Sequence, residues 1–242
     1  MHRLLVKTDL LMDAAPTLPA DAARHLKVVR PKTGEQIELF DGRGSWRVYA
    51  WDGGLRAASS VCSLPADSRP PLTLFACITK GSRWDWTIEK ATELGVTRIV
   101  PVVSARTIVR IPAGEGAAKR ARWMRIAEDA ARQSDAKWLP EIAEAVDFAD
   151  ALAHVARTTC LVGALTDPPP PPLATVVADA LRAHEPDARR EFAVFVGPEG
   201  DFTPEELAAL LKIARPASFG PTVLRAETAA IFAVSVLSAL LR

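Results

Sequence analysis

The strongest pattern in the chain is the stretch Phe192-Ala-Val-Phe-Val-Gly-Pro-Glu-Gly-Asp-Phe-Thr-Pro-Glu-Glu206. Its first five residues are β-branched, aromatic or small, which is the composition of a buried strand over 192–196. Gly and Pro then break the strand. Thr203 predicts a helix N-cap, Pro204 suits the first helical position, and Glu206 completes a capping box. The stretch therefore predicts a strand, a tight turn and a helix.

A second stretch repeats this plan: Phe219-Gly-Pro-Thr-Val-Leu-Arg-Ala-Glu-Thr-Ala-Ala-Ile231. It predicts a short strand over Ala217–Gly220 and a long apolar helix over Ala226–Leu241. Either turn alone is explained by Gly and Pro ending a strand. Two such turns expose backbone N–H groups that suit a small ligand, and Arg225 and Glu227 stand beside the second turn. Together they favour a binding site.

The preceding residues alternate between strand and helix patterns. Strands are predicted at 72–78, 97–103 and 158–165, and helices after Trp86 through Leu94, at 117–134 and at 173–183. Five consecutive prolines, Pro168 to Pro172, form a stiff connector. Such alternation predicts a parallel α/β sheet covered on both faces.

The first 68 residues are typical of a small β domain. Strand-like runs at 26–29, 36–40 and 46–51 are separated by turn signals, and a short helix is predicted at 21–26. Short strands at this spacing predict a compact barrel. The polar, Pro-rich segment 63–71 is the best domain boundary, which predicts domains at 1–70 and 71–242.

Composition sets the broad class of protein. The chain has 242 residues, 49% hydrophobic content and a formal net charge of +1. Residues 71–138 nevertheless hold twelve Lys and Arg against seven Asp and Glu, and acidic residues prevail after 139. The basic block suits either a polyanion or a solvated helix face over 117–134; these two interpretations weigh about equally.

Several function classes lack their motifs. Cys62, Cys77 and Cys160 are isolated, which predicts reduced cysteines in a cytoplasmic protein and neither a disulfide framework nor a metal site. We expect no signal peptide and no membrane span. A dinucleotide fingerprint, a Walker lysine loop and a nucleophile elbow are all missing from the sequence.

Several motifs in order resemble the bacterial 16S rRNA (uracil-N3)-methyltransferase family of the SPOUT superfamily. They are Gly197-Pro-Glu-Gly200 with Phe202-Thr-x-x-Glu206, Gly220-Pro-x-Val-Leu-Arg-x-Glu-Thr-Ala229, Arg24-His-Leu-x-Val-Val-Arg30 with Leu39-Phe-Asp-Gly42, Lys80-Gly81, Glu89-Lys-Ala-Thr-Glu-Leu-Gly95 and Gln133-Ser134. The resemblance covers nearly the whole chain.

The resemblance implies a PUA-like RNA-binding domain, then a methyltransferase domain with a trefoil knot at about 192–231, and a homodimer. It implies S-adenosyl-L-methionine (AdoMet) as methyl donor and no metal. The residues expected to bind the cofactor are Val196, Gly197, Gly200, Phe219, Gly220, Val223 and Leu224.

The expected reaction is methylation of N3 of a uridine in 16S rRNA of the small ribosomal subunit. Because N3 must lose a proton, a cation is needed to stabilise the developing anion, and Arg225 is the candidate. Glu227 would orient Arg225 or accept the proton; a carboxylate favoured by a helix N-terminus is the equal alternative. The residues expected to contact RNA are Arg24, His25, Arg30, Lys80, Arg83, Arg125 and Arg132.

The chain departs from the family pattern at four places. Thr222 and Ala226 replace the usual Arg and Thr, Asp201 replaces a second Gly, and Asp135-Ala136 replaces Gly-Arg. Two alternatives therefore stay open: a SPOUT methyltransferase for another rRNA or tRNA site, and a non-catalytic RNA-binding protein of the same fold.

Overall fold

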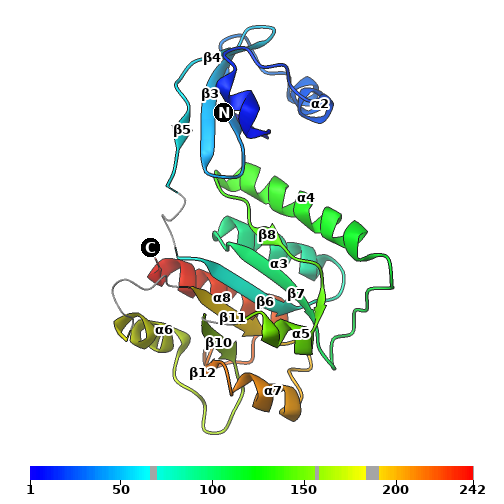
Figure 1. Ribbon diagram of the computed structural model, residues 1–242, viewed down its shortest axis with the longest axis vertical. Coiled ribbons are helices and arrows are strands. Elements are labelled where there is room, and N and C mark those ends of the chain that lie inside the picture. Colours follow the sequence, from blue (N-terminus) through cyan, green and yellow to red (C-terminus); the bar gives the residue numbers. More distant parts are fainter. Residues whose placement is uncertain (66–69, 156–157, 184–190, 242) are drawn as a thin grey trace. The chain divides into compact units, whose positions relative to one another are not determined.

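The computed structural model describes residues 1–65, 70–155, 158–183 and 191–241 (Figure 1). The chain folds into two compact units. The first comprises Met1–Ser68 with Glu128–Leu139, and the second comprises Arg69–Ala127 with Pro140–Arg242. The predicted boundary at 63–71 lies partly outside the described residues, and the separate segment Glu128–Leu139 has no counterpart in the sequence patterns.

The N-terminal unit is built around an open sheet. Its described strands are β1 His2–Leu5, β2 Gln36–Phe40, β3 Ser45–Trp51, β4 Leu55–Ala57 and β5 Cys62–Ser63. The strands pair in the order β1-β2-β3-β4, and β5 pairs with β3. No pairing joins β1 to β4 among these residues, so the compact barrel is not confirmed. Leu4, Ile37, Leu39 and Tyr49 fill the core beneath the sheet.

One predicted strand of this unit is wrong. Leu26–Val29 is the last part of helix α2, Ala20–Val29, which follows the short helix α1, Thr8–Met12. Ala22 and Leu26, four residues apart, face the core, whereas Val28 is 77% exposed. A helical face explains this burial and a strand does not. The β-branched pair Val28-Val29 produced the error, because tertiary packing overrides their local preference.

The second unit contains the predicted parallel sheet. Its described strands are β6 Leu72–Cys77, β7 Arg98–Val103, β8 Glu141–Ile142, β9 Val146–Asp147, β10 Thr159–Gly163, β11 Phe192–Val196 and β12 Arg215–Ala217. They pair in the order β12-β10-β11-β6-β7-β8, with β9 also beside β7, and every pair is parallel. The parallel α/β sheet is thus confirmed.

Helices cover both faces of this sheet, as predicted. They are α3 Ser82–Glu93, α4 Gly116–Ser134, α5 Phe148–Ala153, α6 Leu173–Arg182, α7 Pro204–Leu210 and α8 Ala226–Leu240. Only the first part of α4, up to Ala127, belongs to this unit. Of these described helices, none combines the length and apolar character that crossing a membrane requires.

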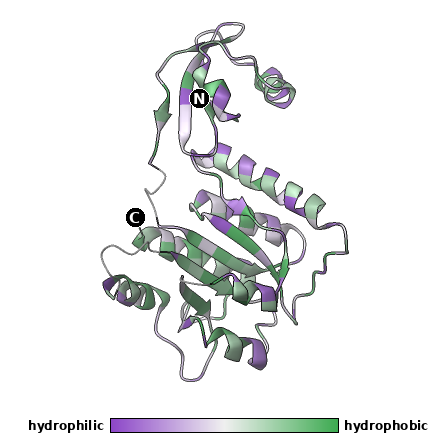
Figure 2. Ribbon diagram, in the orientation of Figure 1, coloured by the Kyte–Doolittle hydropathy of each residue, from purple (hydrophilic) through white to green (hydrophobic). Residues whose placement is uncertain are grey.

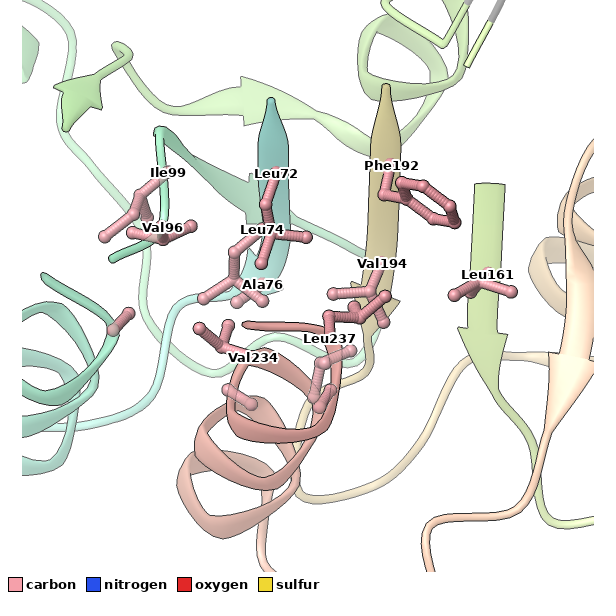
Figure 3. Packing of buried hydrophobic residues seen from close by; sticks show 14 of the residues in the cluster. Leu72, Leu74, Ala76, Val96, Ile99, Leu161, Phe192, Val194, Val234 and Leu237 are labelled. Atoms are coloured by element: carbon pink, nitrogen blue, oxygen red, sulfur yellow. The ribbon is translucent and has the colours of Figure 1, made fainter. Parts of the chain in front are cut away.

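Alternating strand residues divide the core into two layers. Leu74 and Val194 point from one face toward Val234 and Leu237 of α8 (Figure 3). Phe75 and Phe195 point from the other face and stack with ring centroids 4.4 Å apart. Hydrophobic colour accordingly concentrates on the central strands and on α8 (Figure 2). The sheet is therefore buried on both sides, as parallel sheets usually are.

The turns in the stretches 192–206 and 219–231 lie at one edge of this sheet. Because β10, β11 and β12 are parallel, their carboxyl ends at Gly163, Val196 and Ala217 lie on the same edge. The predicted strand Ala217–Gly220 is wrong in position, since β12 ends at Ala217 and the Ser218 hydroxyl then accepts a hydrogen bond from the Gly220 N–H at 3.3 Å. That local bond turns the chain away from the sheet.

Candidate functional site

A cavity of about 280 Å³ lies at the carboxyl edge of the parallel sheet. Three segments form it: the end of β10, the turn after β11, and the chain from β12 into α8. The lining residues are Gly163, Ala164, Leu165, Val196, Gly197, Pro198, Glu199, Asp201, Phe219, Gly220, Thr222, Val223, Leu224, Arg225, Ala226 and Ala229. Ligands of open parallel sheets bind at this edge, so the position alone marks a candidate site.

Hydrogen bonds hold the turn after β11 in a fixed shape. The Asp201 N–H donates to the Pro198 carbonyl at 2.9 Å, and the Arg106 guanidinium donates to the Gly200 carbonyl at 2.8 Å. Asp201 adopts φ 60°, a left-handed conformation that Asp tolerates better than most residues. Its carboxylate accepts from the Phe202 N–H at 2.7 Å. The cavity wall made by this turn is therefore preorganised.

The turn continues into the predicted helix α7. The Thr203 hydroxyl accepts from the Glu206 N–H at 3.2 Å, and the Glu206 carboxylate accepts from the Thr203 N–H at 3.0 Å. The capping box is thus confirmed. The second oxygen of Glu206 also accepts from the Ala105 N–H at 2.8 Å. This carboxylate joins the start of α7 to the loop that follows β7.

Gly163 allows a close contact that shapes the cavity. A Cβ atom at this position would lie 2.6 Å from the Phe219 ring. The aromatic ring therefore lies directly over the backbone at the end of β10. Phe219 also packs against Phe232 of α8, with ring centroids 5.9 Å apart. The ring is fixed from two sides and forms an apolar wall.

The segment between Phe219 and α8 is open to solvent. Gly220 has φ 128°, a conformation that side-chain-bearing residues rarely adopt. Val223 is 76% exposed, and Leu224 is half-buried. Arg225 occupies the N-cap position of α8 and is exposed. Its guanidinium forms no hydrogen bond or ion pair with the residues that the structure describes. Within the described part of the chain, Arg225 is thus an unpaired cation at the rim of the cavity.

Two carboxylates converge on Arg83 at the start of α3. The Arg83 Nη1 lies 3.4 Å from Glu199 Oε1, and the Arg83 Nε lies 3.7 Å from Glu227 Oε1. Glu199 lines the cavity, whereas Glu227, 7% exposed, lies in the first turn of α8. Glu227 Oε2 is buried without a hydrogen bond in the described part of the chain. Arg83 therefore links the turn after β11 to α8.

The residues predicted to bind a cofactor mostly come together. Val196, Gly197, Phe219, Gly220, Val223 and Leu224 all line the cavity, and Gly200 does not. The Gly200 backbone instead accepts the hydrogen bond from Arg106. Arg225 lines the cavity, whereas Glu227 is buried and is not one of the lining residues.

Sequence reasoning missed the wall supplied by the last residue of β10, Gly163, and by Ala164 and Leu165 after it. Part of the information needed to predict this wall is in the sequence, because a strand is predicted at 158–165 and parallel strands end at the same edge of a sheet. The neighbour relation of β10 to β11 and β12 is not in the pattern, so these residues could not be placed beside the two turns. Glu199 stands in the sequence only as part of a motif, and its place in the cavity wall was also missed.

The residues predicted to contact RNA occupy several surfaces. In the N-terminal unit, Arg24 and His25 are exposed on α2, and Arg30 follows the helix. Arg132, in the last turn of α4, pairs with Asp129. In the second unit, Lys80 and Arg125 are exposed, and Arg83 pairs with the carboxylates named above. Their contact with RNA stays a prediction.

The cysteines have ordinary structural surroundings. Burial raises the pKa of the Cys77 thiol to about 11 and that of Cys160 to about 12. Cys62 in β5 is half-buried. Across the described residues, no group of three or more His, Cys, Asp or Glu is arranged to hold a metal ion.

Comparison with known proteins places this geometry in a family. Residues 67–238 match the RNA methyltransferase domain family. The chain is 30% identical to the ribosomal RNA small subunit methyltransferase E of Synechocystis sp., over 99% of this chain and 78% of that protein. It is also 30% identical to the protein of the same name from Bacillus subtilis, over 98% of this chain and 96% of that protein.

A solved structure agrees in fold. The ribosomal RNA small subunit methyltransferase E of Neisseria gonorrhoeae, solved bound to S-adenosyl methionine, matches with a TM-score of 0.79 at 28% identity, over 99% of this chain and 98% of that one. The match to the RNA methyltransferase domain spans the parallel sheet and the whole cavity described above. The resemblance seen in the motifs is therefore confirmed, and the chain belongs to the ribosomal RNA small subunit methyltransferase E family of RNA methyltransferases.

Proposed function

We propose that this chain is an AdoMet-dependent methyltransferase that modifies N3 of a uridine in 16S rRNA of the small ribosomal subunit. Family membership supports methyl transfer to RNA, and the names of the relatives support the small subunit as the source of substrate. The observation that carries the proposal is the cavity at the carboxyl edge of the sheet, which the two motif-bearing turns form together with the end of β10.

The residues around this cavity fit AdoMet. Val196, Leu224 and the Phe219 ring offer apolar walls for an adenine ring. Gly197 and Gly220 carry no side chain, so backbone groups can approach the ligand closely. The carboxylate of Glu199 lies in the cavity wall and suits a cationic ligand. When bound, AdoMet supplies an electrophilic methyl group.

Arg225 is proposed to stabilise the charge that develops on the base. Uracil N3 keeps its proton at neutral pH, and its removal leaves a negative charge shared with O2 and O4. A fixed cation near those oxygens lowers the barrier most effectively. Arg225 lies at the rim and is exposed, and its guanidinium has no partner among the described residues. It is therefore available to the substrate.

Glu227 has a different environment from the one that the sequence suggests. Within the described residues it lies near Arg83, and no ion pair joins it to Arg225. An orienting role toward Arg225 thus has no support from contacts. Its Oε2 atom makes no hydrogen bond in the same set of residues, which leaves that oxygen free to accept a proton. We propose Arg83 as the residue that holds Glu227 in place.

The finer architecture also belongs to the proposal. We infer a trefoil knot over about 192–231, a PUA-like RNA-binding N-terminal domain, and a homodimer. The strand order β12-β10-β11 supports the knot, because the chain leaves β11 and returns on the other side of β10. The exposed Val223 and Phe232 beside the cavity support a partner surface. Light scattering that gives the mass of one chain would reject the dimer.

The deciding experiment is methyl transfer from labelled AdoMet to small subunits that lack the modification, followed by mass mapping of the product. We expect 3-methyluridine at one position of 16S rRNA. Label in another nucleoside or RNA would keep the enzyme class and move the substrate, which Thr222 and Ala226 in place of the family's usual residues make worth testing. AdoMet binding without transfer to any RNA would favour the non-catalytic alternative.

Arg225→Ala tests the proposed mechanism. We expect transfer to fall by at least about a hundredfold, since one preorganised charge contributes that much to many reactions. AdoMet affinity should change little, because Arg225 lies at the rim and the substitution leaves the apolar walls made by Val196, Phe219 and Leu224 in place. Arg182→Ala, which removes a surface arginine paired with Asp179 on α6, is the matched control and should transfer normally. Full turnover by Arg225→Ala would remove this residue from the mechanism.

A further inference from the structure

The N-terminal unit contains an apolar groove that the proposed chemistry does not use. It has a volume of about 390 Å³ and lies between α2 and the hairpin of β3 and β4. Leu18, Leu26, Leu55 and Trp51 contribute apolar wall, and Lys27 and Arg30 stand among them. Trp51 is half-buried, at the end of β3. An aromatic side chain beside two cations suits a ligand with a flat ring and a negative charge.

No residue that the structure describes neutralises the charges of the groove. The side chains of Lys27 and Arg30 form no hydrogen bond or ion pair with any described residue, and no carboxylate is among the lining residues. Elsewhere in this unit there are paired cations: Lys137 lies beside Glu38 and Asp135, and Arg3 lies 3.0 Å from Asp135. The groove therefore presents free positive charge beside its apolar surface.

Arg30 is held in an unusual backbone conformation. It follows α2 with φ 52° and ψ 62°, and its N–H donates to the Leu26 carbonyl at 2.8 Å. This left-handed position after a helix is usually glycine, because other side chains are strained there. An arginine kept at such a position carries its side chain to the groove at a cost in stability. Strain of this kind is concentrated at functional sites.

We propose that this groove binds one unpaired nucleotide of the RNA substrate, with the base against Trp51 and the neighbouring phosphates at Arg30 and Lys27. The inference rests on the proposed function, since it takes RNA as the substrate. A base in a double helix is stacked on its neighbours and cannot enter an apolar groove. A splayed base in a loop or at an end can enter it, and it stacks well on an aromatic side chain.

The test uses the full chain and measures its binding to a fluorescein-labelled single-stranded oligouridylate. The competitor is the duplex that this oligouridylate forms with oligoadenylate. Trp51→Leu keeps the apolar character and removes the stacking ring, so we expect affinity for the single strand to fall roughly tenfold. Trp51→Phe keeps a ring and should stay within about threefold of the native chain. The duplex should compete poorly with the single strand.

Arg30→Gly is the second variant, chosen because glycine suits the left-handed position and the protein should fold at least as well. We expect weaker binding and a slope of log affinity against log salt that is shallower by about 0.7, the effect of one phosphate contact on a single strand. Lys7→Gln is the control, because it also removes one positive charge but from an exposed residue outside the groove. This variant should keep the native RNA affinity.

Unchanged affinity in Trp51→Leu, or equal competition by the duplex, would overturn the inference. A second result would also overturn the inference: Trp51→Leu binds assembled small subunits more weakly than the native chain does, yet binds naked RNA with native affinity. The groove would then contact a ribosomal protein. AdoMet binding and methyl transfer by the native chain are measured alongside. If the native chain neither binds AdoMet nor transfers methyl groups, the proposed function fails. If transfer is retained and the groove substitutions leave RNA affinity unchanged, only the inference about the groove is rejected.

Discussion

Asp201 and Asp135 explain two departures from the family pattern by one backbone property. Both have left-handed conformations, with φ 60° and 61°. The motif pattern that the chain resembles has glycine at these positions, and glycine adopts such angles without strain. Asp is among the few other residues that tolerate them, because its short side chain bonds locally. Both replacements are therefore compatible with the backbone conformation that glycine would adopt there.

The effect of a substitution at Asp201 on the free energy of unfolding should depend on whether the new residue tolerates the left-handed backbone conformation, and not on its charge. Asp201→Asn keeps an acceptor for the Phe202 N–H and tolerance of the left-handed angle, so we expect a stability change within about 0.5 kcal/mol. Asp201→Val places a β-branched residue there and should destabilise by about 1–2 kcal/mol. Urea unfolding measures both. Equal stability of the two variants would contradict this account of the turn.

Gly163 makes a prediction about the cavity wall. Gly163→Ala places a Cβ 2.6 Å from the Phe219 ring, so the ring must move. We expect AdoMet affinity to fall roughly tenfold, because an apolar wall of the proposed adenine pocket is displaced. Titration calorimetry measures the loss. Gly116→Ala is the control: a Cβ there meets nothing within 4 Å, and affinity should stay native.

Individual residues of the cavity wall were predictable where they belong to a sequence motif with glycine at a strand end. The family resemblance implied Gly197 and Gly220, and both line the cavity, where the absence of a side chain lets a ligand approach the backbone closely. Their contact with AdoMet stays a prediction. Gly163 also stands at a strand end, yet a lone glycine there has many ordinary explanations. Its partner Phe219 is far along the chain, and only the folded sheet brings the two together.

Elements with a continuous pattern or a clear cap were predictable, and the shortest strands were not. Strand β11 and helices α4 and α8 agree closely with their predicted ranges, because their patterns are continuous and strong. Strands β4, β5, β8 and β9 have two or three residues each and had no prediction. Such strands exist because a neighbouring strand offers its backbone groups, which is information that local sequence lacks.

The capping box of α7 offers a quantitative test of one helix end. Thr203→Ala removes the acceptor for the Glu206 N–H, and we expect a loss of about 1 kcal/mol in the free energy of unfolding. Thr175→Ala, an exposed threonine in the first turn of α6, is the matched control and should be near neutral. Chemical denaturation distinguishes the two. Equal losses of stability in Thr203→Ala and Thr175→Ala would show that the capping box does not stabilise the protein.

The second unit should lose stability in alkali because of its buried thiols. The pKa values of Cys77 and Cys160 rise from an ordinary value of 9.0 to about 11 and about 12. The unfolded chain therefore releases these protons first as the pH increases. Their contribution to stability is complete below about pH 9 and decreases above it, by at most about 1.4 kcal/mol per pH unit for each thiol.

Denaturant unfolding at a series of pH values measures this decrease. The variant Cys160→Ala should show a shallower decline above about pH 9, since one of the two thiols is gone, whatever its stability at neutral pH. Cys62→Ala changes a half-buried thiol of the other unit and should keep the native slope. Identical slopes in all three proteins would show that the buried thiols do not govern alkaline unfolding.

The arrangement of the whole chain was predictable only in class. Alternating strands and helices predicted the parallel sheet, and the structure confirms it. The assignment of Glu128–Leu139 to the N-terminal unit was beyond the patterns, because the helical period runs without a break from 116 to 134. What joins this segment to its unit is a set of interactions between residues distant in sequence, such as the hydrogen bond from the Leu139 N–H to the Gly42 carbonyl at 2.9 Å.

The difference between the three cysteines has a practical consequence for spectroscopy. Thiols react with maleimides as thiolates, so the high pKa values and burial of Cys77 and Cys160 slow their labelling, whereas Cys62 in β5 is partly accessible. A dye added near neutral pH would attach chiefly at one native position. The unaltered chain thus supplies its own attachment point for a fluorescent reporter on the N-terminal unit, where arrival of a quencher-labelled RNA can be timed by stopped flow.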